Sequence, residues 1–207
     1  ELCGPTICSP SANGMPYQTV GSLHLDFDGI SNYNDYYRDL DIAKAIATTR
    51  FTTNGVTYTR EAYTSFPDQV LVIRLTASQK KSISFTAKYT TPYKSNVVRS
   101  ISSRKELQLS GKANDHEGIE GKVEFTALTR IENNGGSLEA TSDSTLQVKN
   151  ANSVTLYVSI GTNFVNYKDV SGNALSTAQK YLKQVNKNYA KNKAAHINAY
   201  QKYFNRV

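Results

Sequence analysis

The segment from Arg38 to Ala77 constrains the fold more than any other part of the chain, because it reads as consecutive β-strands joined by short turns. Asn54-Gly55 separates two runs of threonine, aromatic and β-branched residues, and this dipeptide readily supplies the positive φ angles of a tight type I′ hairpin turn. Phe66-Pro67-Asp68 interrupts the pattern, since proline has no N–H to donate to a strand ladder. The run Val70–Leu75 that follows is apolar enough to be covered on both faces. These features predict a large antiparallel sheet.

Apolar and polar residues also alternate outside this segment, with the period of two that is typical of half-buried strands. The alternation is found in four further runs, which are Leu23–Phe27, Ile83–Tyr89, Val123–Ile131 and Val154–Ile160. Hairpins at this spacing predict a mainly β fold, a large antiparallel β-sandwich (supersandwich) over residues 1–173. Residues 1–16 are rich in glycine, proline and serine, and we expect them to form a loop or an arm.

Three segments are expected to connect the strands. Asp28–Tyr37 reads as a loop, since its Gly, Asn and Asp residues satisfy backbone groups locally. Tyr93–Lys105 reads as a connection with one short strand. Asn133-Asn134-Gly135-Gly136 is a strong turn signal. Two short strands, near residues 137–140 and 145–149, are expected to follow this turn and to complete a meander.

Two helices are expected after residue 173. Ser176 and Gln179 fit a capping box for a helix that begins near Leu175. Two apolar stripes with helical spacing follow, and they consist of Ala178, Tyr181, Leu182 and Val185, then Ile197, Tyr200 and Phe204. Residues 174–207 are therefore predicted to be a helical linker that leaves the sandwich.

The net charge of +7 comes from this linker, because residues 174–207 carry seven basic and no acidic residues, whereas the rest of the chain has 17 of each. Basic residues spread over several helix faces are more often solvated, or docked to acidic neighbours, than bound to phosphate. We therefore expect no nucleic-acid partner. No window approaches the roughly 18 apolar residues of a membrane span, so no membrane-spanning segment is expected.

Several motifs resemble, in order and spacing, the N-terminal β-sandwich domain of family 95 glycoside hydrolases, which include α-L-fucosidases and some α-galactosidases. The motifs are Asn13–Leu23, Tyr36–Asp41, Ala45–Ala47, Gly55–Glu61, Ser65–Val70 and Thr162–Asn173. The segment His196–Val207 resembles the far end of the helical linker that in this family leads into a catalytic (α/α)6 barrel.

The resemblance implies a non-catalytic domain of an inverting enzyme, with an α-L-fucosidase as the expected parent. In the family the general acid, the general base and the asparagines that assist the base all belong to the barrel, so no catalytic residue carries over to this chain. The chain alone is expected to be inactive and to need no cofactor. Its expected partners are the (α/α)6 domain of the same protein and fucosylated or galactosylated glycans.

Four residues in two of the matching motifs are candidates for contact with a substrate or with the neighbouring domain. They are Tyr17, Gln18, Asn163 and Asn166, which are expected in loops at strand ends, where a rigid sandwich presents polar groups. The structural alternative is that these loops only cover the surface between domains. No metal site is expected, because His24, His116 and His196 are scattered and neither a CxxC nor an HExxH motif occurs.

Other charged and aromatic groups have a structural and a functional interpretation. Asp115-His116-Glu117 is either an acid/base cluster or a turn, and adjacent residues of an extended chain point in different directions. The charges on the hairpin segment are interpreted as cross-strand or interdomain ion pairs, and they are Arg38, Asp39, Asp41, Arg60 and Glu61. A freestanding carbohydrate-binding module remains the alternative function, with Tyr33, Tyr36 and Tyr37 in place of tryptophan, which the chain lacks.

The compartment is indicated only indirectly. The chain begins without a signal-peptide pattern, as a mature secreted chain or a cytosolic one would, and it contains no Asn-x-Ser/Thr sequon. Cys3 and Cys8 enclose four residues, so they form either a small-loop disulfide in an oxidising compartment or free thiols. Taken with the resemblance, these features lead us to expect a periplasmic or secreted bacterial protein.

Overall fold

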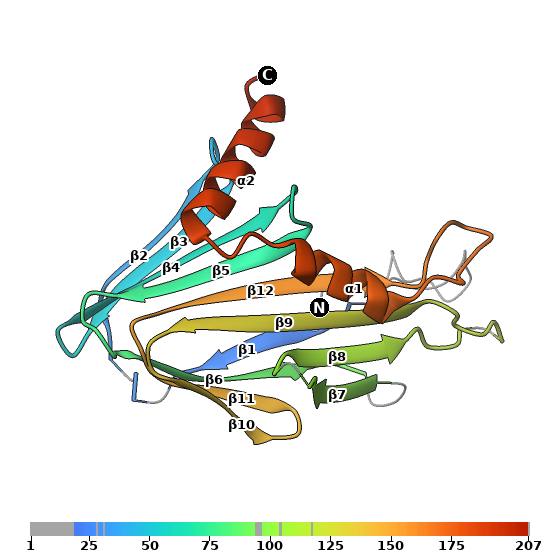
Figure 1. Ribbon diagram of the computed structural model, residues 1–207, viewed down its shortest axis with the longest axis horizontal. Coiled ribbons are helices and arrows are strands. Elements are labelled where there is room, and N and C mark those ends of the chain that lie inside the picture. Colours follow the sequence, from blue (N-terminus) through green and yellow to red (C-terminus); the bar gives the residue numbers. More distant parts are fainter. Residues whose placement is uncertain are drawn as a thin grey trace.

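The computed structural model describes residues 19–206 except 28, 31, 94–96, 104 and 117. The described residues form twelve strands in two antiparallel sheets, followed by two helices (Figure 1). The larger sheet has the order β2 (Asn34–Asp41), β3 (Ile46–Thr53), β4 (Val56–Ser65), β5 (Val70–Ala77), β12 (Ser153–Thr162), β9 (Glu124–Asn134), β8 (Leu107–Lys112) and β7 (Val97–Ile101). The smaller has the order β1 (Ser22–Asp26), β6 (Ile83–Thr90), β11 (Thr145–Ala151) and β10 (Ser137–Ser142). The helices are α1 (Ala174–Gln184) and α2 (Tyr189–Phe204), so the predicted mainly β sandwich with helices at its C-terminal end is confirmed.

The Asn-Gly hairpin forms as predicted. Asn54 and Gly55 both have positive φ angles, 50° and 74°, and Thr53 pairs with Val56 directly across the two-residue turn. Such a turn twists in the same sense as the strands that it joins. The next strand ends at Ser65, just before the Phe66-Pro67-Asp68 interruption.

The main core lies between the two sheets. It includes the alternating residues of β6, which are Ile83, Phe85, Ala87 and Tyr89, and the partly buried residues Leu23, Leu25 and Phe27 pack against it. Burying the Tyr89 ring raises the pKa of its hydroxyl to about 12, and this hydroxyl shares a hydrogen bond of 2.5 Å with Thr129 Oγ1. The predicted alternation of these strands is thus the inner face of a sandwich.

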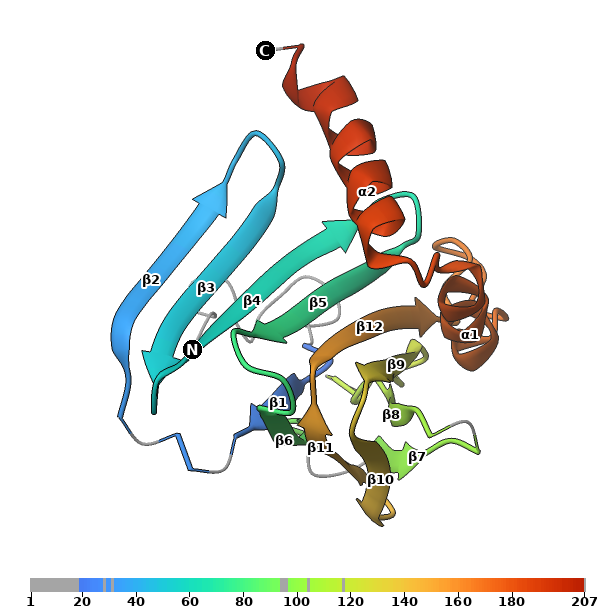
Figure 2. The same ribbon diagram turned by 60° about the vertical axis from the view of Figure 1, so that its left-hand side comes forward.

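A second core lies on the outer face of the larger sheet, under the helices. It joins Val70 and Val72 of β5 to Ala178, Leu182 and Val185, whereas Leu75 of β5 belongs to the main core. Strand β5 is therefore covered on both faces, as its apolar run predicted. In Figure 2 both helices lie on the side of the larger sheet away from β1, β6, β10 and β11.

Helix α1 lies close against strands β12 and β9. Gly161 of β12 makes this approach possible, because a Cβ at that position would lie 2.3 Å from Ala174 O and 2.8 Å from Ala178 N. Ser159 Oγ donates a hydrogen bond of 2.9 Å to Ala178 O. At the other end of the helix, Arg130 Nη1 donates to Leu182 O at 2.8 Å. Helix α1 thus belongs to the packed domain, and α2 projects beyond the sheet (Figure 1).

Two predicted boundaries were wrong. The loop expected over Asp28–Tyr37 ends earlier, because β2 begins at Asn34 as an edge strand with a register irregularity between Asn34 and Tyr37. The polar residues of this edge gave no strand pattern. Ser176 is not the helix cap either, since Asn173 is the N-cap and its Oδ1 accepts a hydrogen bond of 2.7 Å from Ser176 N. Both residue types cap helices well, so composition did not separate them.

The expected meander after Gly135-Gly136 was also wrong. The two strands form, but β10 and β11 belong to the smaller sheet, whereas β9 belongs to the larger one. The chain returns to the larger sheet at Asn152, which is the single residue between β11 and β12. Asn152 Oδ1 accepts a hydrogen bond from Lys81 N at 3.0 Å, and its backbone N–H donates to Asn134 O at 2.8 Å. Asn152 therefore connects the three segments in which the chain crosses between the sheets, which are β5–β6, β9–β10 and β11–β12.

The contact at Gly161 leads to a first prediction. Gly161→Ala should lower the free energy of unfolding by about 1–3 kcal/mol, because the added methyl group meets backbone atoms of α1 that cannot move independently. The neighbouring exposed Thr162→Ala should cost less than about 0.5 kcal/mol. Chemical denaturation of both variants measures the difference, and equal stabilities would contradict the close packing of α1.

Candidate functional site

The four predicted contact residues fall into two groups. Tyr17 and Gln18 lie outside the described residues, as do Cys3 and Cys8. Asn163 is buried and its amide is used within the domain. Its Oδ1 accepts from Glu124 N at 2.8 Å and its Nδ2 donates to Lys122 O at 3.0 Å. Asn163 thus fastens the end of β12 to the start of β9.

Asn166 lies in the exposed loop that Asn163 anchors. Its Oδ1 accepts a hydrogen bond of 2.9 Å from Lys168 N, and its backbone pairs with Asp169, so residues 166–169 form a tight turn. Three large apolar side chains of this loop are more than half exposed, and they are Phe164, Val165 and Tyr167. Asn163 and Asn166 thus lie in one loop, but Asn163 bonds within the domain whereas Asn166 lies in an exposed turn. Contact of the four residues with a substrate or another domain stays a prediction.

Among the described residues the hairpin charges form no cross-strand ion pair, and the interdomain pairs expected as the alternative stay a prediction. Asp41 pairs with Lys44 at 2.7 Å within the turn after β2, and Glu61 pairs with Lys193 of α2. Within the described part of the chain, Arg38 and Arg60 have no ion pair. The sequence did not show that α2 would return to this face and supply the cation.

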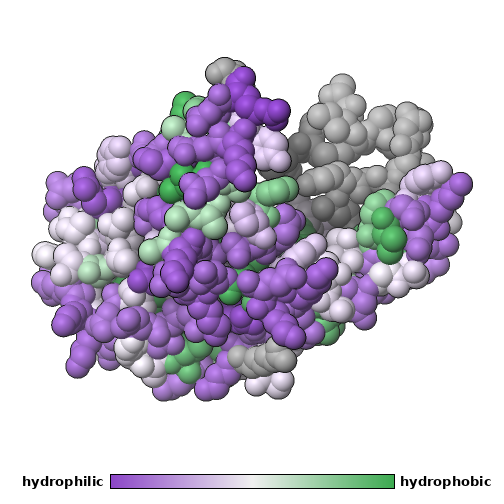
Figure 3. Space-filling model, turned by 45° about the horizontal axis from the view of Figure 1, so that its top comes forward, coloured by the Kyte–Doolittle hydropathy of each residue, from purple (hydrophilic) through white to green (hydrophobic). Residues whose placement is uncertain are grey.

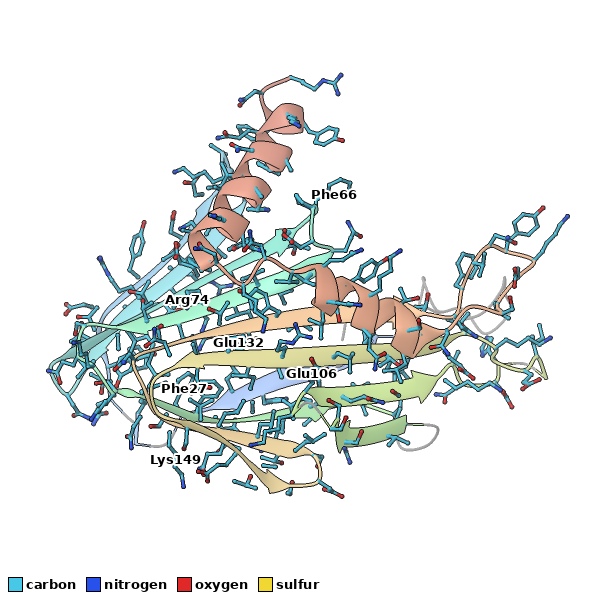
Figure 4. All side chains as sticks on the ribbon, viewed as in Figure 1. Phe27, Phe66, Arg74, Glu106, Glu132 and Lys149 are labelled. Carbon is cyan, nitrogen blue, oxygen red and sulfur yellow. The ribbon has the colours of Figure 1, made fainter. Side chains whose placement is uncertain are left out.

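Helix α2 docks on β4 mainly through polar groups. Glu61 accepts hydrogen bonds from Lys193 and, at 2.8 Å, from the hydroxyl of Tyr189. Burial alone would raise the pKa of Glu61, but these two bonds and the charges of Lys193 and Arg74 outweigh it and hold the pKa below its ordinary value. The ring of Tyr189 also lies against the guanidinium of Arg74, 5.2 Å away. Figure 4 labels Arg74.

The next turn of α2 continues this polar contact. Asn192 is fully buried, accepts a hydrogen bond of 2.7 Å from Tyr63 and donates one of 3.0 Å to Asp68. His196 stacks on the Tyr63 ring, with centroids 4.6 Å apart, and its Nε2 lies 2.9 Å from Lys44 O. Directional contacts of this kind fix the angle and register of a helix more closely than apolar packing alone.

A large hollow lies on the opposite face of the same strands. It has a volume of about 540 Å³. Its described lining residues come from β2, β3, β4 and the loop before β2, and they are Ile30, Tyr33, Tyr36, Arg38, Ala47, Thr49, Phe51, Arg60 and Ala62. None of them is acidic. Tyr33 and Tyr36 were candidates for sugar stacking in the alternative function, but the hollow itself was not predicted, because nothing in the strand pattern shows that the smaller sheet does not cover β2 and β3.

Several described carboxylates form ion pairs or hydrogen bonds within the domain, and these contacts are structural. Glu106, only 3% exposed, accepts from Arg130 Nε and Nη2 at 2.8 and 2.7 Å, and Glu132 pairs with Lys187 at 2.8 Å (Figure 4). Asp115 accepts a hydrogen bond of 2.9 Å from Gly121 N, which supports a turn there, while Glu117 lies outside the described residues.

The described residues form neither a metal site nor a membrane-spanning helix. Among the described residues, no group of three or more His, Cys, Asp or Glu side chains is placed to hold a metal ion. Neither described helix is long and apolar enough to cross a membrane. The face that carries the helices is mostly hydrophilic, with hydrophobic residues in small separate patches (Figure 3).

The two asparagines of the 163–172 loop lead to a second prediction. Asn163→Ala removes a buried amide and leaves Glu124 N and Lys122 O without these partners, so it should cost about 1–3 kcal/mol and loosen the loop. The matched control Asn166→Ala loses one exposed contact and should cost less than about 1 kcal/mol. Hydrogen exchange of the loop amides and denaturation would measure both effects. Equal effects of the two variants would contradict the anchoring role of Asn163.

Glu61 leads to a third prediction, on pH. Its pKa in the folded protein lies below the ordinary value of 4.5, so its ionised form stabilises the fold above about pH 4.5 and this contribution is lost as the pH falls through the lower folded-state pKa. Glu61→Gln should cost about 1–3 kcal/mol at neutral pH and flatten this acid dependence. Glu132→Gln removes a more exposed pair and should cost less than about 1 kcal/mol. Thermal unfolding from pH 3 to 7 tests this, and an unchanged acid slope in Glu61→Gln would refute it.

Comparison with known proteins identifies the sandwich. A family model described as the glycosyl hydrolase family 65 N-terminal domain matches residues 1–167. The α-L-fucosidase 2 of Arabidopsis thaliana is 28% identical over 94% of this chain and 26% of its own length. The "Probable alpha-fucosidase A" of Aspergillus oryzae is 26% identical over 72% of this chain and 20% of its own length. The chain therefore spans about a quarter or less of these relatives.

A solved structure shares the fold. A protein described as a kojibiose phosphorylase, from the human microbiome, superposes with a TM-score of 0.51 over 84% of this chain and 25% of that chain. The sequence identity is 14%, so this likeness concerns the fold alone. The match of the family model covers all the described strands of the two sheets. The chain belongs to the family of glycosyl hydrolase family 65 N-terminal domains.

Proposed function

We propose that this chain is the non-catalytic N-terminal domain of a family 95 type glycoside hydrolase, and that the parent enzyme is an inverting α-L-fucosidase. The observation that carries the proposal is the alignment of 94% of the chain with only 26% of an α-L-fucosidase. Two motifs that resemble family 95 have structural places here. Gly55–Glu61 forms the end of the hairpin turn and the first part of β4, on which α2 docks. Thr162–Asn173 forms the loop that Asn163 anchors.

The role proposed for the domain is to support the catalytic (α/α)6 domain of the same protein. An apolar hollow of about 320 Å³ lies between α2 and the β4–β5 turn, and it is lined by Thr64, Phe66, His196, Ala199, Tyr200 and Tyr203. Phe66 and Tyr203 are 66% and 61% exposed (Figure 4 labels Phe66). Exposed aromatic residues beside a rigidly docked helix suit a contact between domains. The exposed apolar tip of the 163–172 loop is a second candidate for this contact.

Catalysis is assigned to the partner domain because buried and partly buried carboxylates of the described residues already form ion pairs within this domain. Inversion needs two carboxyl groups about 6.5–9.5 Å apart with a water between them. Glu61, Glu106 and Glu132 each hold a cation that fixes the helices or the sheet. The described lining of the 540 Å³ hollow supplies no acid. The chain alone is therefore proposed to be inactive.

The second candidate is a freestanding carbohydrate-binding module. It is favoured by Tyr33 and Tyr36, which line the 540 Å³ hollow and are 57% and 55% exposed. Tyr37 does not join them, because it lies on the other face of the sheet, where the Arg50 guanidinium lies 5.7 Å from its ring. The same tyrosines are compatible with a domain of a larger enzyme that binds fucosylated or galactosylated glycans. A periplasmic or secreted bacterial location is proposed because such glycans lie outside cells.

Activity measurements test the proposal. The chain alone and the complete product of its reading frame are assayed against an aryl α-L-fucoside, with the product anomer followed by NMR. The complete product should hydrolyse the substrate and release β-L-fucose first, and the chain alone should show no turnover. Turnover by the chain alone contradicts the proposal, as does a complete product that ends with this chain and is inactive.

A further inference from the structure

Three rows of side chains cross the inner face of β2, β3 and β4. The strand register aligns Arg38 with Thr49 and Thr49 with Arg60, so the two arginines lie two strands apart, about 10 Å between their Cα atoms. The neighbouring row on one side is Leu40, Ala47 and Ala62, and on the other side Phe51 pairs with Tyr58. The small alanines leave room beside the arginines, and the aromatic residues form a wall.

The smaller sheet leaves this part of the face open. Figure 2 shows β2 and β3 extending away from β1, the edge strand of the smaller sheet. Phe51 stacks on Tyr58, with centroids 5.4 Å apart, and Tyr33 lies 5.7 Å from Tyr36 and 6.1 Å from Phe51. The aromatic wall therefore consists of Tyr58, Phe51, Tyr33 and Tyr36. It begins beside the core at Tyr58 and ends in the solvent at Tyr36.

The described lining of the hollow carries positive charge only. Neither Arg38 nor Arg60 has an ion pair within the described part of the chain, and the described lining has no carboxylate. Arg38 is exposed, whereas Arg60 is partly buried against the Phe27 ring, 6.0 Å away. The Nε atom of Arg60 is buried without a hydrogen-bond partner. Buried donors in folded proteins usually have partners, so the guanidinium of Arg60 carries a charge that the described residues do not compensate and that a nearby anion would offset.

We propose that this face binds an acidic saccharide, with a carboxylate or sulfate group on the Arg38–Arg60 row and sugar rings against Tyr33, Tyr36 and Phe51. Guanidinium groups bind such anions through paired charge-assisted hydrogen bonds. Aromatic rings offer the apolar, rigid surface on which a sugar ring packs. The binding is a property of this chain, and it does not depend on the sugar preference or the activity of a parent enzyme.

A single-stranded nucleic acid is the competing ligand, since aromatic rings and arginines also bind bases and phosphates. Such ligands need a positive groove that follows many phosphates. Here β2 also carries Asp35, Asp39 and Asp41, and the chain before residue 174 has equal numbers of basic and acidic residues. One or two anionic groups fit this face better than a continuous phosphate chain.

Calorimetric titration of the 207-residue chain tests the proposal. The probes are α-1,4-linked trimers of galacturonic acid and of galactose, a sulfated galactose trimer, and an oligothymidylate. The galacturonate trimer or the sulfated trimer should bind at least about tenfold more tightly than neutral galactose, as charge-assisted hydrogen bonds predict. Preference between these two acidic trimers identifies carboxylate or sulfate as the anion.

Two matched pairs of variants locate the site. Arg38→Gln and Tyr36→Ala should each weaken binding of the acidic trimer by about tenfold or more, whereas Arg50→Gln and Tyr37→Ala, on the opposite face, should leave it unchanged. Unfolding curves confirm that each variant is folded. Equal binding of acidic and neutral trimers, no binding of either, tighter binding of oligothymidylate, or equal losses on both faces would each overturn the proposal.

Discussion

The unequal width of the two sheets determines most of this structure. Eight strands face four, so the smaller sheet covers only part of the inner face of the larger one. Strand β12 shows the consequence most clearly, because Val154 and Leu156 lie in the main core and Tyr157, on the other face, lies under the helices. A sheet that is apolar on both faces needs two covers. Here one cover is the smaller sheet and the other is formed by α1 and α2, and the inner face of β2 and β3 is left open.

The two helices meet the sheet by different physical means. Helix α1 buries Ala178 and Leu182 completely, in ordinary apolar packing made close by Gly161. Helix α2 instead buries Asn192 and His196, which have partners on β4 and in the turns beside it. Buried polar networks need every partner in place, so they specify one arrangement. The contrast indicates that α1 completes the domain, whereas α2 is set at a defined angle to it.

Sequence patterns predicted the strands well where the signal was local. The positive φ angles at Asn54 and Gly55 and the alternation in β6 follow from turn chemistry and side-chain period. Pairing between distant segments was not predictable in this way. Gly135-Gly136 looks like any hairpin turn, yet it transfers the chain between sheets, because the partner of the next strand is decided by tertiary packing. Asn163 and Asn166 are the same residue type three positions apart, and only the structure shows that one is buried and the other exposed.

The open face connects the hairpin to the candidate binding site. Arg38, Thr49 and Arg60 are spaced eleven residues apart and form one row only because two turns set the registers of β2, β3 and β4. A slip of one residue in either turn would move one arginine to the outer face, since successive side chains of a strand point to opposite sides. Asn54-Gly55 fixes the second register through its two positive φ angles. The feature that most constrains the fold thus also brings together the guanidinium groups of Arg38 and Arg60 in the hollow.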